Sequence, residues 1–205
     1  REAAFYGTAL TELTIPDKVT DIGKYAFKNC TALKNVIFSK NLKKIDDSAF
    51  YACGGLTVLN LPDSLTEIRD YAFRKCTELK TVNFSAGLKT IGESSFYGCE
   101  KLTELKLPEG VTDIKGYAFK GCIGVTTITL PSTLKTMGES SFYGCTGITK
   151  MEIPKNVTTV GAYAFSRCSK LSQVTFKGNA PTIGAYAFAK VTAKISYPSG
   201  NATWS

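Results

Sequence analysis

Cysteine is the most reactive side-chain type in this chain, and its seven copies are evenly spaced. Each follows the previous one by 23 residues, and no C-x-x-C pair occurs. Metal sites built from cysteine need several thiolates that converge on one point, and an odd number of thiols cannot all form disulfides. We therefore expect no metal and no cofactor, and a buried column of free thiols acting as small apolar side chains. These cysteines are Cys30, Cys53, Cys76, Cys99, Cys122, Cys145 and Cys168.

Other groups that could do chemistry are scarce. The chain has no histidine, which removes the Ser-His-Asp and Cys-His nucleophile pairs. Paired carboxylates for glycoside hydrolysis remain as an alternative, with Glu104 and Glu152 among the acids on the predicted strands. Each of these two acids has a lysine two residues away, at Lys106 or Lys150, and we expect ion pairs between them. The prediction is a protein that is not an enzyme.

The cysteines belong to a longer repeat of 23 residues. A phenylalanine lies three residues before each cysteine position, in eight copies from Phe27 to Phe188. Within a unit, apolar residues alternate with polar ones, as Val82 and Phe84 do, which predicts a short strand. A second apolar pair and the phenylalanine then predict a short β-like segment and a single helical turn. A long period repeated eight times is typical of a solenoid, in which each coil is stable only against its neighbours.

The unit can be written L-x-x-[VIL]-x-[FIL]-x3-[LV]-x2-I-x3-[AS]-F-x2-C, and residues 79–99 follow it throughout. This pattern resembles the BspA-like (Treponema-type) leucine-rich repeat family of bacterial surface proteins. The resemblance implies an α/β solenoid, a right-handed superhelix with a concave parallel β-sheet of short strands and a convex side of short β and helical turns. It also implies secretion or anchoring at the cell surface and a protein-binding or adhesive role.

We expect residues 1–205 to form a single domain of this kind. Residues 1–9 are interpreted as a partial N-terminal repeat, residues 10–193 as eight repeats, and residues 194–205 as a C-terminal cap and tail. The cap includes a ninth strand with Ile195 and Tyr197 facing inward. Because the chain opens on a segment that resembles the middle of a unit, we interpret it as a monomeric piece of a longer protein.

The outward positions on the predicted strands are polar and free of aromatic residues. Charged residues cluster there in one place, and this patch is the first candidate for a ligand-binding site. The patch consists of Glu104, Lys106, Thr127, Thr129, Lys150 and Glu152.

A second candidate comes from an alternation between successive units. In the position after the phenylalanine, cations and tyrosines alternate, and neighbouring coils about 5 Å apart would align them as a ladder of cation–aromatic contacts on the outer corner. We expect this ladder mainly to stabilise the surface. The alternative is a ligand-facing stripe whose rings stack on sugars while its cations bind acidic groups. The ladder residues are Lys28, Tyr51, Arg74, Tyr97, Lys120 and Tyr143.

The net charge of +8 is scattered over all units without a long basic run, so we expect no nucleic-acid binding. No apolar run approaches the ~20 residues that span a bilayer, and we expect no membrane insertion. The sequence favours a non-catalytic binding or adhesion module, extracellular or at the cell surface, that recognises a host or bacterial surface protein or glycan. The alternative is a structural spacer in a larger surface protein, without a ligand of its own.

Overall fold

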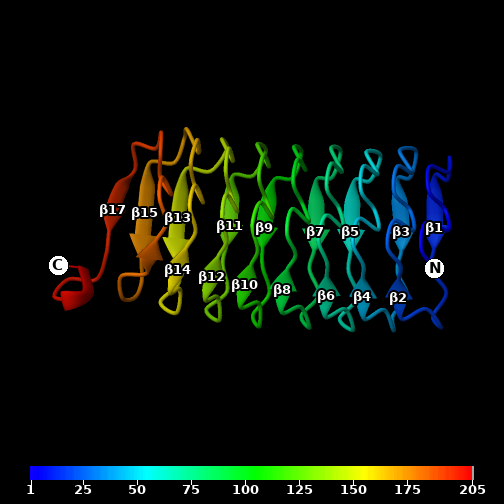
Figure 1. Ribbon diagram of the computed structural model, residues 1–205, viewed down its shortest axis with the longest axis horizontal. Coiled ribbons are helices and arrows are strands. Elements are labelled where there is room, and N and C mark those ends of the chain that lie inside the picture. The colour runs from blue at the N-terminus through cyan, green and yellow to red at the C-terminus, as the bar shows by residue number, and fades with distance from the viewer. Residues whose placement is uncertain (205) are drawn as a thin grey trace.

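The computed structural model describes residues 1–204, and it is a parallel β-solenoid (Figure 1). The chain winds through eight coils of 23 residues, which we number from the one that begins at Leu10. The coils stack along one axis, with the two termini at opposite ends (Figure 1). No helix in the described residues is long and apolar enough to cross a membrane. The expected solenoid of short parallel strands is confirmed.

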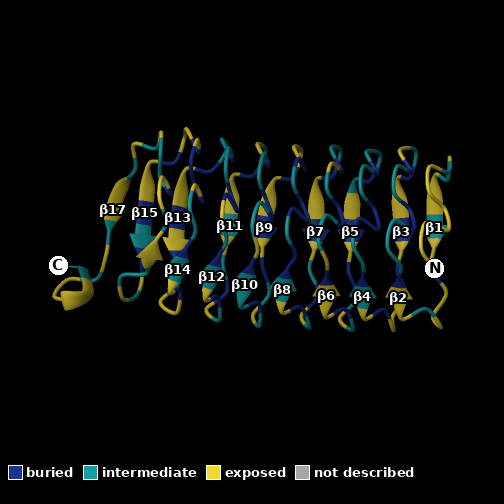
Figure 2. Ribbon diagram, viewed as in Figure 1, coloured by how far each residue is buried: buried dark blue, intermediate teal, exposed yellow. Residues whose placement is uncertain are grey.

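The longer strands form one side of the solenoid, and we call their outward surface the strand face. Residues pair with the equivalent residue of the next coil, as Glu12 does with Asn35. Inward residues such as Leu59 are buried and their neighbours are exposed (Figure 2), because successive side chains of a strand point to opposite sides. The longer strands are β1 (Glu12–Thr14), β3 (Asn35–Ile37), β5 (Val58–Asn60), β7 (Thr81–Asn83), β9 (Glu104–Lys106), β11 (Thr127–Thr129), β13 (Lys150–Ile153), β15 (Gln173–Phe176) and β17 (Lys194–Ser196).

The two-residue strands form a second, continuous sheet of eight strands. Each contributes one buried residue to the core in coils one to seven, as Ile68 does. These strands are β2 (Asp21–Ile22), β4 (Lys44–Ile45), β6 (Glu67–Ile68), β8 (Thr90–Ile91), β10 (Asp113–Ile114), β12 (Thr136–Met137), β14 (Thr159–Val160) and β16 (Thr182–Ile183).

The sheet on the strand face is interrupted after every second coil up to coil six. Its strands pair as β1–β3, β5–β7, β9–β11 and β13–β15–β17. In coils two and four the last inward residue is Phe38 or Phe84, whose ring packs edge-on against the phenylalanine of its own coil. These rings are larger than Ile15 or Leu61 at the same place in coils one and three. Bulk at this place does not by itself interrupt the sheet, because Phe176 holds it in coil eight and β15 still pairs with β17. The interruption after coil six follows Leu130 and has no such ring beside it.

A stack of phenylalanine rings runs through the core. Rings of successive coils lie nearly parallel, with centroids 5.4 Å apart for Phe73 and Phe96 and 5.5 Å apart for Phe96 and Phe119. The seven cysteines are buried and free, as expected. The Cys122 thiol donates a hydrogen bond to the Phe96 carbonyl at 3.2 Å. The core is therefore a set of columns, each built from the equivalent positions of successive coils, and two of them consist of phenylalanine and of cysteine.

The segment around each phenylalanine is a run of turns rather than the single helical turn that we expected. In coil three, Tyr71 and Lys75 have left-handed backbones, with φ of 61° and 60°. The backbone N–H groups of Tyr71, Phe73 and Lys75 donate to carbonyls of coil four at 2.7 to 2.8 Å. A helix would satisfy these donors within its own coil, whereas here they join one coil to the next.

Aromatic residues cover both ends of the stack. Phe5 stacks on Phe27 at 5.2 Å. At the other end, β17 pairs with β15, and Trp204, in the 3-10 helix η1 (Ala202–Trp204), packs 4.7 Å from Phe176 and 4.9 Å from Tyr197. Ile195 lies opposite the buried Val174 but is itself 42% exposed.

Candidate functional site

The first candidate patch lies on β9, β11 and β13, and all six of its residues are exposed. Strand pairing places Thr127 opposite Glu104, and Thr129 opposite Lys106. Lys150 and Glu152 continue the same two rows on β13, on the far side of the interruption after coil six. The structure thus brings the six residues to one face, in two parallel rows.

The ion pairing within this patch differs from the prediction. Glu152 pairs with Lys177 of the next coil at 3.1 Å, and not with Lys150. Within residues 1–204, no ion pair joins Glu104 to Lys106. Glu152 therefore reaches a lysine of the next coil rather than the lysine on its own strand.

Two grooves open on the strand face where its sheet is interrupted. The groove between coils four and five has a volume of about 370 Å³, and the groove between coils six and seven has a volume of about 480 Å³. Thr129 and Glu109 line both grooves, so the two are adjacent. We call them together the strand-face groove. Of the six predicted residues, Lys106, Thr129 and Glu152 line it, while Glu104, Thr127 and Lys150 form the neighbouring row.

The strand-face groove combines an apolar floor with charges of both signs. Phe84, Leu107 and Leu130 contribute to the floor. Glu109 accepts hydrogen bonds from the Ser132 backbone N–H at 3.1 Å and from its hydroxyl at 2.9 Å, and the backbone bond is the main reason that the pKa of Glu109 is lowered. This carboxylate is a fixed acceptor. The arrangement can hold a ligand by apolar contact and hydrogen bonds.

The predicted cation–aromatic ladder forms. Lys28 lies 4.9 Å from the ring centroid of Tyr51, and Arg74 lies 4.2 Å from that of Tyr97. The next cation continues the series, since Lys120 lies 4.6 Å from the Tyr143 ring. The two-coil alternation in the sequence therefore corresponds to a continuous line of contacts.

The ladder rings have cations in both neighbouring coils. Tyr97 lies between Arg74 at 4.2 Å and Lys120 at 5.7 Å. Each cation also contacts a tyrosine of its own coil, as Arg74 does with Tyr71 at 5.6 Å, and all these side chains are half-buried. Ring faces that are already occupied cannot stack on sugars, which supports the stabilising role over the ligand-facing stripe.

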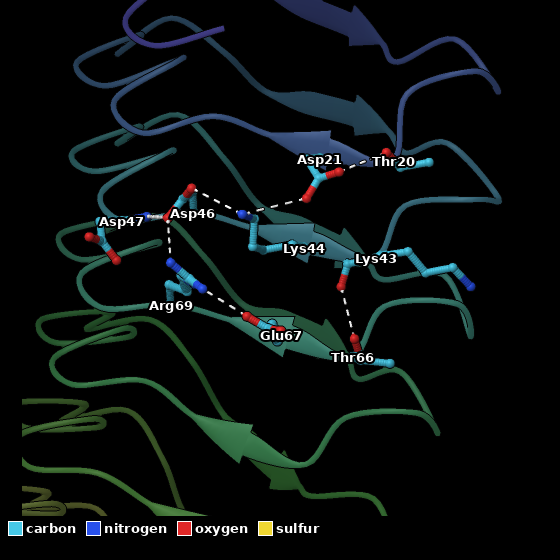
Figure 3. A network of polar contacts seen from close by, with 9 residues as sticks. All are labelled: Thr20, Asp21, Lys43, Lys44, Asp46, Asp47, Thr66, Glu67 and Arg69. Carbon is cyan, nitrogen blue, oxygen red and sulfur yellow. Dashed lines mark hydrogen bonds and ion pairs between the residues drawn. The ribbon is translucent and has the colours of Figure 1, made fainter.

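A network of ion pairs, absent from our sequence-based expectations, lies beside the two-residue strands (Figure 3). Lys44 bridges Asp21 at 3.6 Å and Asp46 at 3.4 Å, and Arg69 bridges Asp46 at 3.5 Å and Glu67 at 3.2 Å. Burial acts to raise the pKa of Asp46, but the Asp47 backbone N–H and the two cations outweigh it, and the pKa is lowered. These charges largely neutralise one another, although a depression of about 570 Å³ opens beside them.

Comparison with known proteins agrees with this geometry. The BspA type Leucine rich repeat region matches residues 1–122 and 89–203, in six copies. The chain belongs to the BspA-type leucine-rich repeat family. Similar solved structures include a leucine-rich repeat protein from Bacteroides ovatus, 28% identical with a TM-score of 0.77, over 97% of this chain and 58% of that one. The chain thus spans less than two thirds of that protein.

Two further leucine-rich repeat structures resemble this BspA-type chain. The protein from Eubacterium ventriosum is 26% identical, with a TM-score of 0.72, over 93% of this chain and 45% of that one. The T. pallidum protein is 28% identical, with a TM-score of 0.59, over 83% of this chain and 69% of that one. No curated protein matches the sequence.

Sequence reasoning missed most of the residues that line the groove in this BspA-type chain. Glu109, Ser132 and Lys155 come from the turns after the strands, and Lys177 directly follows β15. An available signal was the alternation of the last inward residue, which is aliphatic in coils one and three and Phe38 or Phe84 in coils two and four. That alternation marks the first two coil junctions at which the sheet opens.

Proposed function

We propose that this BspA-type chain is a non-catalytic binding module, secreted or held at the cell surface, and that residues 1–205 act as one domain. Its ligand is a host or bacterial surface protein or glycan. The family resemblance supports the location. The strand-face groove is the observation that carries the proposal, because ligand sites are concave, with an apolar lining and a few placed polar groups.

The scaffold around the groove suits recognition. The fixed carboxylate of Glu109 and the ion pair between Glu152 and Lys177 present charges in defined positions. The buried Leu105 and Met151 anchor the flanking strands in the core. A rigid groove loses little conformational entropy on binding.

The test is a screen of the purified chain against arrayed surface proteins and glycans, at about 150 mM and about 500 mM salt, because high salt screens nonspecific attraction to a basic protein. We expect at least one ligand that is retained at the higher salt concentration. Replacing Thr129, which lines both grooves, by tryptophan should abolish that binding. The matched control is Asn35→Trp, on the same face of β3 and outside the groove.

The outcome separates the alternatives. Loss with Thr129→Trp but not with Asn35→Trp, with unchanged circular dichroism, supports the groove as the binding surface. Equal binding by both variants contradicts it. A chain that retains no ligand at high salt contradicts the proposal and favours the structural spacer.

A further inference from the structure

A row of lysines runs along the solenoid at the start of the two-residue strands, on a surface distinct from the strand-face groove. The position before each of these strands is threonine in coils one, three, five and seven, and lysine in coils two, four and six. We call Lys43, Lys89 and Lys135 the lysine row, and all three are exposed.

The lysine row is unpaired. Within residues 1–204, none of its three ammonium groups has an ion-pair partner, whereas the adjacent Lys44 has two. Figure 3 shows Lys43 extended away from the network in which Lys44 takes part. The Lys89 ammonium lies instead over Gly110 of the next coil, a residue without a side chain.

The acids that begin the two-residue strands of coils one, three and five, next to the lysine row, are engaged elsewhere. Asp21 pairs with Lys44, Glu67 pairs with Arg69, and Asp113 accepts a hydrogen bond from Thr112 at 2.6 Å. The lysine row therefore presents positive charge that no described carboxylate neutralises.

The spacing of the lysine row restricts which polyanions can bind along it. Neighbouring coils are separated by about 4.8 Å, so lysines in alternate coils lie about 10 Å apart along the axis. Phosphates of one nucleic-acid strand are spaced at about 3.4 Å along the helix axis, too closely for this row. An extended disaccharide is about as long as two coils are thick, so a linear polysaccharide with an acid on every second ring has the same period.

We propose that the lysine row binds a linear acidic polysaccharide, laid along the solenoid axis, that carries one carboxylate per disaccharide. Each ammonium meets one carboxylate, and the threonines between them face the neutral rings. Three contacts are individually weak, but the chain of sugars joins them into one binding event.

The test measures binding of an alternating uronic acid–amino sugar octasaccharide by titration calorimetry, in about 50 mM and about 150 mM salt. The triple variant Lys43→Gln, Lys89→Gln, Lys135→Gln should weaken binding by about 10-fold or more. The control variant also removes three positive charges, by substituting Gln for the exposed residues Lys75, Lys170 and Lys190, which lie outside the lysine row. It should weaken binding by less than about 3-fold.

A second variant keeps the net charge of the protein and changes only the spacing of the lysines. The double substitution Thr66→Lys with Lys89→Thr moves the middle lysine from coil four to coil three. It should weaken binding of the octasaccharide by about 5-fold. The proposal is overturned if the triple variant and its control lose the same affinity for the octasaccharide, or if the double substitution at 66 and 89 loses none. Equal affinity of the protein for a single-stranded oligonucleotide would also overturn it. The Thr129→Trp variant should bind the octasaccharide normally, which separates this surface from the strand-face groove.

Discussion

Ser95 and Ser141 occupy a buried column in which the other coils place alanine. Their hydroxyl oxygens are buried and have no hydrogen-bond partner in the described part of the chain. A buried polar group without a partner is destabilising. The alanines of this column are Ala26, Ala49, Ala72, Ala118, Ala164 and Ala187.

Replacing either serine by alanine should therefore stabilise the protein. We expect Ser95→Ala and Ser141→Ala each to raise the free energy of unfolding by about 1 kcal/mol, measured by urea denaturation. The reverse change, Ala118→Ser, is the control and should lower it by a similar amount. A loss of stability in Ser95→Ala would show that the hydroxyl has a role that its geometry does not reveal.

The buried thiols predict an alkaline limit to stability. Burial raises the pKa of Cys53 to about 12, and it raises the pKa of Cys122 well above its ordinary value. Below about pH 9 these thiols are protonated in the folded and the unfolded chain, so their contribution is fully present. Above that pH the unfolded chain releases their protons first, and stability falls until the folded thiols also ionise.

We expect the free energy of unfolding, measured by urea denaturation, to fall between about pH 9 and pH 12, by up to about 1.4 kcal/mol per pH unit for each thiol with a raised pKa. The variant Cys122→Ala should begin less stable, because it leaves a cavity, but its stability should fall less steeply with pH. Parallel pH profiles for the variant and the parent would contradict this linkage, because they would show that the Cys122 thiol does not contribute to the pH dependence.

At the scale of elements, the phenylalanine stack joins each coil to both of its neighbours. Phe96 has stacking partners on both sides, whereas Phe188 stacks on Phe165 alone and is half-buried. We expect Phe96→Ala to lower the free energy of unfolding by about 3 to 5 kcal/mol and Phe188→Ala by clearly less. Urea denaturation of both variants checks this prediction. Equal losses of unfolding free energy would mean that the number of stacking partners does not determine how much a phenylalanine contributes to stability.

The strands and core columns follow directly from the sequence, because alternation and the 23-residue period specify which side chains face inward. The turns around the phenylalanines do not. Glycine signals a left-handed backbone at Gly98, Gly121 and Gly144, but Tyr71 and Lys75 adopt it as well. Their backbone N–H groups donate hydrogen bonds to the next coil. These contacts join residues that are far apart in the sequence, so local sequence propensity cannot predict them.

At the scale of the molecule, the candidate site was only partly predictable for a similar reason. Outward residues such as Lys106 and Glu152 follow from strand alternation, and the sequence placed them on one face. The groove beside them exists because neighbouring coils separate at certain junctions. The interruption after coil six follows Leu130, so a phenylalanine at the junction is not required for the sheet to open.

The ladder predicts how the solenoid responds to shortening. Deleting residues 79–101 removes one coil and brings Arg74 next to Lys120, so two like charges replace a cation–aromatic contact. Deleting residues 56–101 removes two coils and brings Tyr51 next to Lys120, which restores the alternation. We expect amide hydrogen exchange at the new junction to be about 10-fold faster in the one-coil deletion than in the two-coil deletion. Equal protection would contradict the prediction.

This alternation also defines a unit of growth for the protein. Because cation and tyrosine repeat only every second coil, a copy of residues 56–101 inserted after residue 101 continues the contacts on both sides, and so does each further copy. A series of such insertions would yield rods whose length increases in equal steps while each step carries the same surface chemistry. The length of the solenoid can therefore be set in steps of two coils.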